Sequence, residues 1–91
     1  MTAPITLYTK GYCPFCKRAK SLLAQQNITE WTEYDLEVVP ERLGEMMTRS
    51  NGRRTVPQIF IGNQHIGGSD DLYDLIASGQ FDAVLNTANA A

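Results

Sequence analysis

Two cysteines separated by two residues constrain the fold of this chain more than any other feature. Cys13 and Cys16 are the only cysteines among its 91 residues. A strand-like run, Ile5 to Thr9, precedes them, and a helix-like run begins straight after them. Two thiols at this spacing can exchange electrons as a dithiol and a disulfide. We therefore expect a strand, a turn and a helix built around a redox-active cysteine pair.

The start of the predicted helix distinguishes the two thiols. Unpaired backbone N–H groups and the positive end of the helix dipole favour an anion there. Cys13 lies at or beside the N-cap, and Pro14 suits the first helical position because its missing N–H costs nothing there. Cys16 falls about one turn further in, where it should be less exposed and less acidic. We expect Cys13 to be the attacking thiol and Cys16 the resolving thiol.

Other roles for the cysteine pair are weaker. Structural zinc normally takes four ligands, whereas the chain has two cysteines and a single histidine, His65. A structural disulfide between such close neighbours would remove little chain entropy, because that stabilisation grows with loop length. We therefore expect no metal ligands.

Composition favours one globular domain without nucleic-acid or membrane partners. The chain is 43% hydrophobic, and its formal net charge of −2 argues against nucleic acid as the main partner. No apolar run precedes Lys10, and no stretch approaches the ~20 apolar residues of a membrane span. We expect a monomer with one domain over residues 1–85, a frayed tail over residues 86–91, and a reducing cytoplasm as its location.

The predicted elements alternate between strand and helix, which indicates an α/β fold. Strands are predicted over residues 5–9, 30–36, 58–61 and 64–66, and helices over residues 14–26, 40–50, 69–78 and 81–85. The first two strands should be parallel because a helix joins them, whereas the Gly62-Asn63 turn should make the last two antiparallel. The expected architecture is a mixed four-stranded sheet with helices on both faces, in the order β-α-β-α-β-β-α.

Three motifs together resemble the dithiol glutaredoxins, which have a thioredoxin-like fold. They are Thr9-Lys10-x-x-Cys13-Pro14-Phe15-Cys16, Thr55-Val56-Pro57 and Gly67-Gly68-Ser69-Asp70-Asp71, and the likeness extends from Ile5 to about Leu85. The resemblance implies a glutathione-dependent thiol–disulfide oxidoreductase that reduces protein disulfides and glutathionylated proteins. It also implies that glutathione is a co-substrate and that no cofactor is bound.

The resemblance assigns the central glutathione contacts to two of these motifs. Val56-Pro57 would be a cis-proline step, and the exposed Val56 backbone would pair with an extended substrate as an added strand does. Ser69 and Asp70 would hold the γ-glutamyl end at the start of a helix. Asp71 adjoins these contacts.

Further contacts implied by the resemblance surround the thiol. Lys10 would favour the Cys13 thiolate and hold the glycyl carboxylate of glutathione. Phe15 stands where many relatives have tyrosine, so its ring can wall the site without a hydroxyl. The remaining implied contacts are Thr55 and Gly68.

The residues alone leave several assignments open. Pro57 could simply begin a strand, and Ser69 with its two aspartates could be only a capped helix start. A second cation for glutathione could be any of four arginines, Arg42, Arg49, Arg53 or Arg54. We interpret His65, Trp31 and Tyr8 as ordinary packing or strand residues.

Two rival functions fit less well. A redoxin driven by thioredoxin reductase is disfavoured by Lys10, by the Ser69-Asp70-Asp71 run and by the absence of tryptophan before Cys13. A dimer holding an iron–sulfur cluster is disfavoured by Pro14 and Cys16, since cluster-binding relatives usually carry one active-site cysteine.

Overall fold

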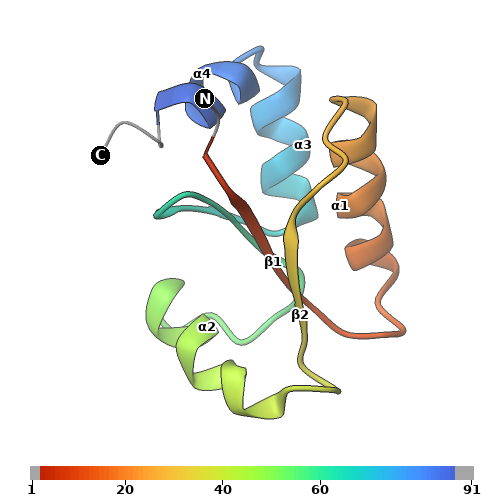
Figure 1. Cartoon of the computed structure of the whole chain (residues 1–91), viewed down its shortest axis with the longest axis vertical. Coiled ribbons are helices and arrows are strands. Elements are labelled where there is room, and N and C mark those ends of the chain that lie inside the picture. Colours follow the sequence, from red (N-terminus) through yellow and green to blue (C-terminus); the bar gives the residue numbers. More distant parts are fainter. Residues whose placement is uncertain (1–2, 88–91) are drawn as a thin grey trace.

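Strands and helices alternate in the expected order in the computed structural model, which describes residues 3–87 (Figure 1). The elements are β1 (Ile5–Thr9), α1 (Pro14–Gln25), β2 (Thr32–Asp35), the 3-10 turn η1 (Pro40–Arg42), α2 (Leu43–Arg49), β3 (Gln58–Ile61), β4 (Gln64–Gly67), α3 (Ser69–Ala77) and α4 (Phe81–Thr87). None of the helices in this range has the length and apolar character needed to cross a membrane.

The four strands form one mixed sheet, as predicted, and their order within it is β2-β1-β3-β4. β1 runs parallel to β2 and antiparallel to β3, and β3 runs antiparallel to β4. Phe60 lies opposite His65, but the next pair is Ile59 with Gly67, so β4 carries one extra residue, a β-bulge. The turn between β3 and β4 has Gly62 at a φ of 59°, consistent with the predicted primed type.

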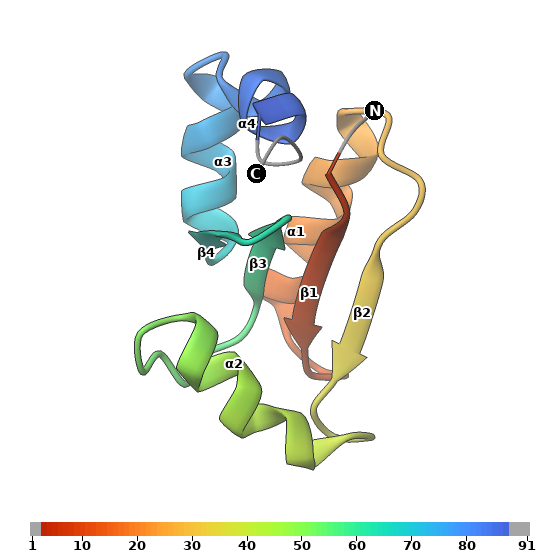
Figure 2. The same cartoon turned by 60° about the vertical axis from the view of Figure 1, so that its left-hand side comes forward.

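One face of the sheet is covered by α1 and α3, which lie side by side, with α4 at one end (Figures 1 and 2). Helix α1 presents Ala19, Leu22 and Leu23 to the sheet at helical spacing, and all three are buried. They meet Leu7 of β1 and neighbouring residues of β3, α3 and α4 in one apolar core. This face is held by the burial of hydrocarbon side chains.

The opposite face is covered by α2, so helices flank both faces as predicted (Figure 2). Its smaller apolar cluster includes Tyr8 and Met46, both fully buried. The Tyr8 hydroxyl donates a hydrogen bond to Glu45 and accepts one from Arg49 Nη1 at 2.9 Å. The contacts on this face are therefore partly polar.

Element ends differ from the sequence prediction by more than one residue at three places. The helix predicted over residues 40–50 begins as the 3-10 turn η1, in which Pro40 takes the first position, where its missing N–H is tolerated. The second strand is shorter than the predicted 30–36. The last helix continues through Asn86 and Thr87, because no glycine or proline stops it after Leu85. Part of the predicted frayed tail is thus helical, and residues 88–91 lie outside the described range.

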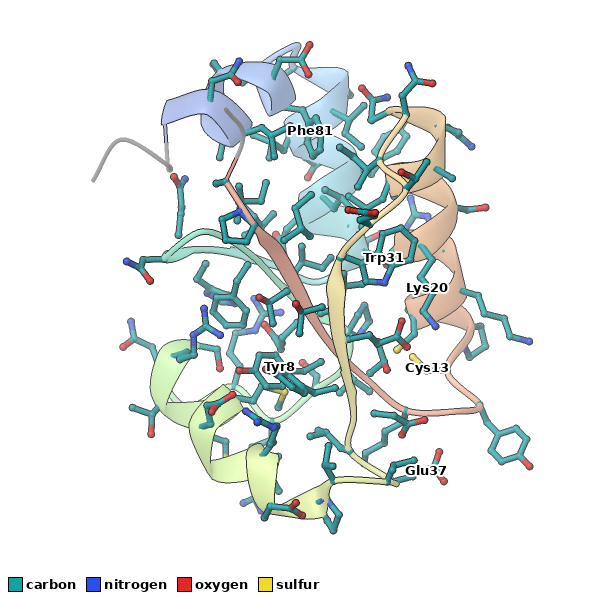
Figure 3. The ribbon with its side chains drawn as sticks, in the orientation of Figure 1. Tyr8, Cys13, Lys20, Trp31, Glu37 and Phe81 are labelled. Atoms are coloured by element: carbon teal, nitrogen blue, oxygen red, sulfur yellow. The ribbon has the colours of Figure 1, made fainter. Side chains whose placement is uncertain are left out.

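The two ends of the described chain meet. The Ala3 N–H donates a hydrogen bond to the Leu85 carbonyl at 3.0 Å. This bond ties the segment before β1 to the last helix, at the end of the sheet opposite the cysteines (Figure 3).

Candidate active site

The strand directions bring the three motifs to one end of the sheet. β1 ends there and leads into α1, where Cys13 lies (Figure 3). β3 begins at the same end because it runs antiparallel to β1, and this places the Thr55–Pro57 loop nearby. β4 runs antiparallel to β3 and ends there too, so the start of α3 joins the same region.

Cys13 is the N-cap of α1, as predicted. Its backbone is extended, with φ −90° and ψ 112°, and Pro14 takes the first helical turn. The Cys13 sulfur accepts a hydrogen bond from the Cys16 backbone N–H at 3.3 Å. The same thiol donates to the Val56 carbonyl at 3.6 Å. The Cys13 sulfur is thus half-buried at the N-cap of α1 and has one backbone N–H directed at it.

Cys16 lies deeper in the first turn of α1, as expected from its spacing. It is buried, with 2% of its surface exposed, and both cysteines are free thiols. Burial, followed by the effect of the neighbouring Cys13, raises the pKa of Cys16 to about 12. Cys16 is therefore a neutral thiol near pH 7, and it must lose its proton when it attacks. The expectation that Cys16 is the less exposed of the two thiols is confirmed.

Two shallow grooves lie on either side of Val56, and Val56 lines both of them. The first, of about 490 Å³, is lined by Lys10, Tyr12, Cys13, Leu36, Glu37 and Val56. The second, of about 220 Å³, is lined by Phe15, Arg53, Thr55, Val56, Pro57, Gly68, Ser69, Asp70 and Asp71. Every residue predicted for the site lines one of these grooves, apart from the buried Cys16. The Val56-Pro57 peptide bond is cis, as the resemblance implied.

The start of α3 is held by a side chain of its own first turn. The Gly68 N–H donates a hydrogen bond to Asp71 Oδ2 at 2.9 Å. The same Asp71 oxygen lies 3.6 Å from Arg53 Nη1. At Gly67, where φ is +120°, a side-chain Cβ would come within 2.3 Å of Asp71 Oδ2. Asp71 thus caps its own helix, so at least part of its role is structural.

Asp70 is paired with an arginine that the sequence prediction had not linked to it. Arg18 of α1 forms an ion pair with Asp70, and its guanidinium lies 5.4 Å from the centre of the Tyr73 ring. The Asp70 side chain is nevertheless 81% exposed. No local pattern could have indicated this pair, because the two residues are 52 positions apart.

The structure separates three of the four candidate arginines. Arg53 lines the second groove. Arg42 is paired with Glu45 at 3.0 Å and lies 3.8 Å from the centre of the Tyr34 ring, and Arg49 is bonded to Tyr8. Arg53 is therefore the one of these three that faces the predicted glutathione contacts.

The loop before Cys13 has an anchor that sequence analysis missed. Glu37 Oε1 accepts a hydrogen bond from the Gly11 N–H at 2.6 Å. The Glu37 N–H in turn donates to Asp35 Oδ1 at 2.8 Å. Glu37 thereby connects the segment after β2 to the loop that precedes Cys13 (Figure 3). An acidic residue just past a predicted strand was the available signal, but it is a common surface feature.

Comparison with known proteins agrees with this geometry. The glutaredoxin family model matches residues 5–66. Glutaredoxin 3 of Escherichia coli is 48% identical over 91% of this chain and 98% of its own length. The solution structure of a glutaredoxin from Brucella melitensis is 46% identical, covers 94% of this chain and 91% of that chain, and superposes with a TM-score of 0.78. A buckwheat glutaredoxin–glutathione complex is 28% identical, covers 97% and 81% of the two chains, and has a TM-score of 0.81.

A dithiol at a helix N-cap on this mixed sheet defines a thioredoxin-like thiol–disulfide oxidoreductase. Within that class, the chain belongs to the glutaredoxin family. Its activity is glutathione-dependent thiol–disulfide oxidoreduction.

Proposed function

We propose that Cys13 and Cys16 are the redox pair and that glutathione occupies the two grooves beside Val56. The observation that carries this proposal is the setting of the Cys13 sulfur. It receives the Cys16 N–H at 3.3 Å and lies 3.6 Å from the Val56 carbonyl, which borders both grooves. A nucleophile and a strand-like docking edge are thus adjacent.

The reaction would follow ordinary disulfide exchange. The Cys13 thiolate attacks one sulfur of a substrate disulfide, forms a mixed disulfide with it, and releases the other sulfur as a thiolate that takes a proton. Cys16 then loses its proton and attacks Cys13, which releases the target and leaves a Cys13–Cys16 disulfide. Alternatively, glutathione attacks the mixed disulfide directly. Two molecules of glutathione reduce the enzyme and become glutathione disulfide.

Ionisation of Cys13 would also prepare the docking edge. The protonated thiol donates its S–H to the Val56 carbonyl, whereas a thiolate has no proton to donate. The carbonyl is then free to accept an N–H from glutathione. On this proposal Lys10 and Arg53 attract carboxylates of glutathione, Thr55 and Phe15 wall the groove, and the start of α3 at Gly68 and Ser69 binds the γ-glutamyl end.

Asp70 would bind the ammonium of the γ-glutamyl end in competition with Arg18. Its carboxylate is 81% exposed, so its second oxygen is open to a ligand. We expect Asp70→Ala to raise the KM for glutathione several-fold and to change stability by only about 0.3–1 kcal/mol. An unchanged KM for glutathione would contradict this contact.

Single substitutions of the two cysteines test the proposal. Cys13→Ser should abolish all disulfide chemistry. Cys16→Ser should still remove glutathione from a glutathionylated peptide but should lose reduction of a protein disulfide that needs the second thiol. The measurement is glutathione-coupled turnover of both substrates by both variants. Equal inactivity of the two variants on the peptide would refute the glutathione mechanism and favour a thioredoxin-type cycle.

We further propose that the protein acts as a monomer in the reducing cytoplasm, on disulfide-containing and glutathionylated proteins, without a resident cofactor. Cycling thiols require a reducing pool, and the exchange chemistry needs only glutathione. Anaerobic reconstitution with iron and sulfide tests the rival function. Visible absorption from a cluster, together with glutathione-dependent dimerisation, would support the cluster-binding dimer instead.

A further inference from the structure

A row of hydrogen bonds connects β4 to the loop that carries Val56. His65 Nε2 lies 2.7 Å from Gln58 Oε1. Gln58 Nε2 donates to the Thr55 carbonyl at 2.9 Å and to Thr55 Oγ1 at 3.1 Å. The row therefore starts outside both grooves and ends at the residue preceding Val56.

The two bonds to Thr55 fix the direction of every bond in the row. A side-chain amide has two donor hydrogens, both on nitrogen, and an oxygen that only accepts. The Gln58 nitrogen is directed at two Thr55 oxygens, so its oxygen must face His65. His65 must then supply a hydrogen on Nε2, which assigns the Nε2–H tautomer to the neutral ring.

The surroundings of the row favour keeping its hydrogen bonds intact. Gln58 is fully buried, so an unpaired amide there is costly. The His65 ring lies against Phe60, with 4.9 Å between ring centres. Burial lowers the pKa of His65, Arg53 and Arg49 lower it further, and Asp71 opposes them. Protonation would not break the row, because imidazolium keeps its Nε2–H.

We infer that His65 is a positioning residue for substrate binding, because it orients the Gln58 amide and thereby holds the backbone of the Thr55–Val56 loop in place. The inference rests on the proposed function for the role of the Val56 backbone. His65 borders neither groove described above, so its effect must pass through Gln58. The predicted consequence is weaker substrate binding with little change in the chemical step.

Substitution of His65 tests this role. His65→Leu removes the donor and leaves Gln58 Oε1 unpaired, so we expect the KM for a glutathionylated peptide to rise about three- to tenfold. The kcat should stay within about twofold, because neither cysteine is touched. His65→Gln should restore most of the binding, since its amide nitrogen can reach the position of Nε2. If the leucine variant does not fold, His65→Asn replaces it, because the shorter amide does not reach Gln58.

A double-mutant cycle separates positioning from general destabilisation. In a Gln58→Leu background, His65→Leu should add less than about a twofold further change in KM, because the two residues act through one row. Tyr8→Phe is the matched control. It removes hydrogen bonds from the same face of the sheet without touching Thr55, so it should lower stability but leave the KM unchanged. Additive effects in the cycle, or an equal KM change in the control, would overturn the inference.

The tautomer gives a readout that does not depend on catalysis. His65 is the only histidine, so its ring nitrogens are assigned directly in a long-range ¹H–¹⁵N spectrum of the tag-free protein. We expect the Nε2–H tautomer at neutral pH, and a shifted Val56 amide signal in folded His65→Leu. A neutral ring protonated on Nδ1, or a Val56 signal that does not move, would overturn the inference. Failure of the wild-type protein to use glutathione would instead refute the proposed function, and these spectra would still test the row.

Discussion

The two faces of the sheet are held together by different forces. The face under α1 and α3 is closed by apolar side chains such as Leu7 and Leu23, which are fully buried. The face under α2 has a smaller apolar cluster and a set of directed bonds, among them Tyr8 with Arg49 and Gln58 with Thr55. Apolar burial is strong but does not select one orientation, whereas a hydrogen bond weakens quickly when its geometry changes.

This difference matches what each face supports. The apolar face carries α1, which has Cys13 at its N-cap and Cys16 in its first turn. The packing of apolar side chains under α1 therefore sets the position of the nucleophile. The α2 face reaches the Thr55–Pro57 loop through Gln58, so directed bonds there set the orientation of a backbone. Stability should therefore depend mainly on the first face, and the fine geometry of binding mainly on the second.

The largest expected effect is on the apolar face. Leu23→Ala should lower the free energy of unfolding by about 2–5 kcal/mol, because it removes buried methyl groups and leaves a cavity. Urea denaturation measures this loss. Val38→Ala is the control, since Val38 is 76% exposed, and its effect should stay within about 0.5 kcal/mol. A loss as small as the control's would mean that α1 is not held by packing.

The junction between β4 and α3 should give the next effect. Gly67→Ala should cost roughly 2–4 kcal/mol, because φ is +120° and the new Cβ would meet Asp71 Oδ2 at 2.3 Å. Thermal or urea denaturation gives the measurement. Gly68→Ala is the matched control, because its Cβ would meet nothing nearer than the Pro57 carbonyl oxygen at 3.7 Å. Equal losses of stability in the two variants would contradict the role of Asp71 as the cap of α3.

On the α2 face, Tyr8→Phe should cost about 0.5–1.5 kcal/mol, the usual net value of a hydrogen-bonded hydroxyl. The ring stays, so packing is unchanged and the loss reports the bonds to Glu45 and Arg49. Tyr34→Phe is the comparison, since the Tyr34 hydroxyl makes no hydrogen bond to another side chain or backbone group of residues 3–87. If both variants lose the same stability, the directed bonds on this face contribute nothing specific.

The smallest effect should have the opposite sign. Gly44 lies inside α2, and a Cβ there would meet nothing within 4 Å. Gly44→Ala should therefore stabilise the protein by about 0.5–1 kcal/mol. Gly52 is equally open but has a φ of +89°, so Gly52→Ala should destabilise it. A stabilising result at both positions would show that space alone, and not backbone conformation, decides the outcome.

Local signals explain why the element order could be predicted. Asn27, Asn51 and Gly79 all adopt positive φ at helix ends, which is the conformation their residue types favour. The connecting helix and the tight turn then indicated which consecutive strands are parallel and which antiparallel, but they did not indicate that β1 pairs with β3. The β-bulge before Gly67 was not predicted, because the alternation of residues along the strand does not indicate where one extra residue is inserted.

The site was predictable where a motif carried it and unpredictable where distant side chains meet. The cysteine pair and the start of α3 follow from local rules. The pairing of Arg18 with Asp70 depends on how α1 lies against α3. The prediction treated His65 as an ordinary strand residue, although the Gly62-Asn63 turn already set Phe60 opposite it and made Gln58 its diagonal neighbour.

The hydrogen bond between Ala3 and Leu85 makes this chain suitable for circular permutation. Because Ala3 and Leu85 are in contact, a short linker can join the two ends of the domain. New chain termini can then be placed at an exposed turn such as Asn51-Gly52, where no strand is cut. Ala3 and Leu85 also lie at the end of the sheet opposite the cysteines. A reporter domain or a surface tether attached at either end would therefore leave Cys13 and the grooves beside it open to large protein substrates.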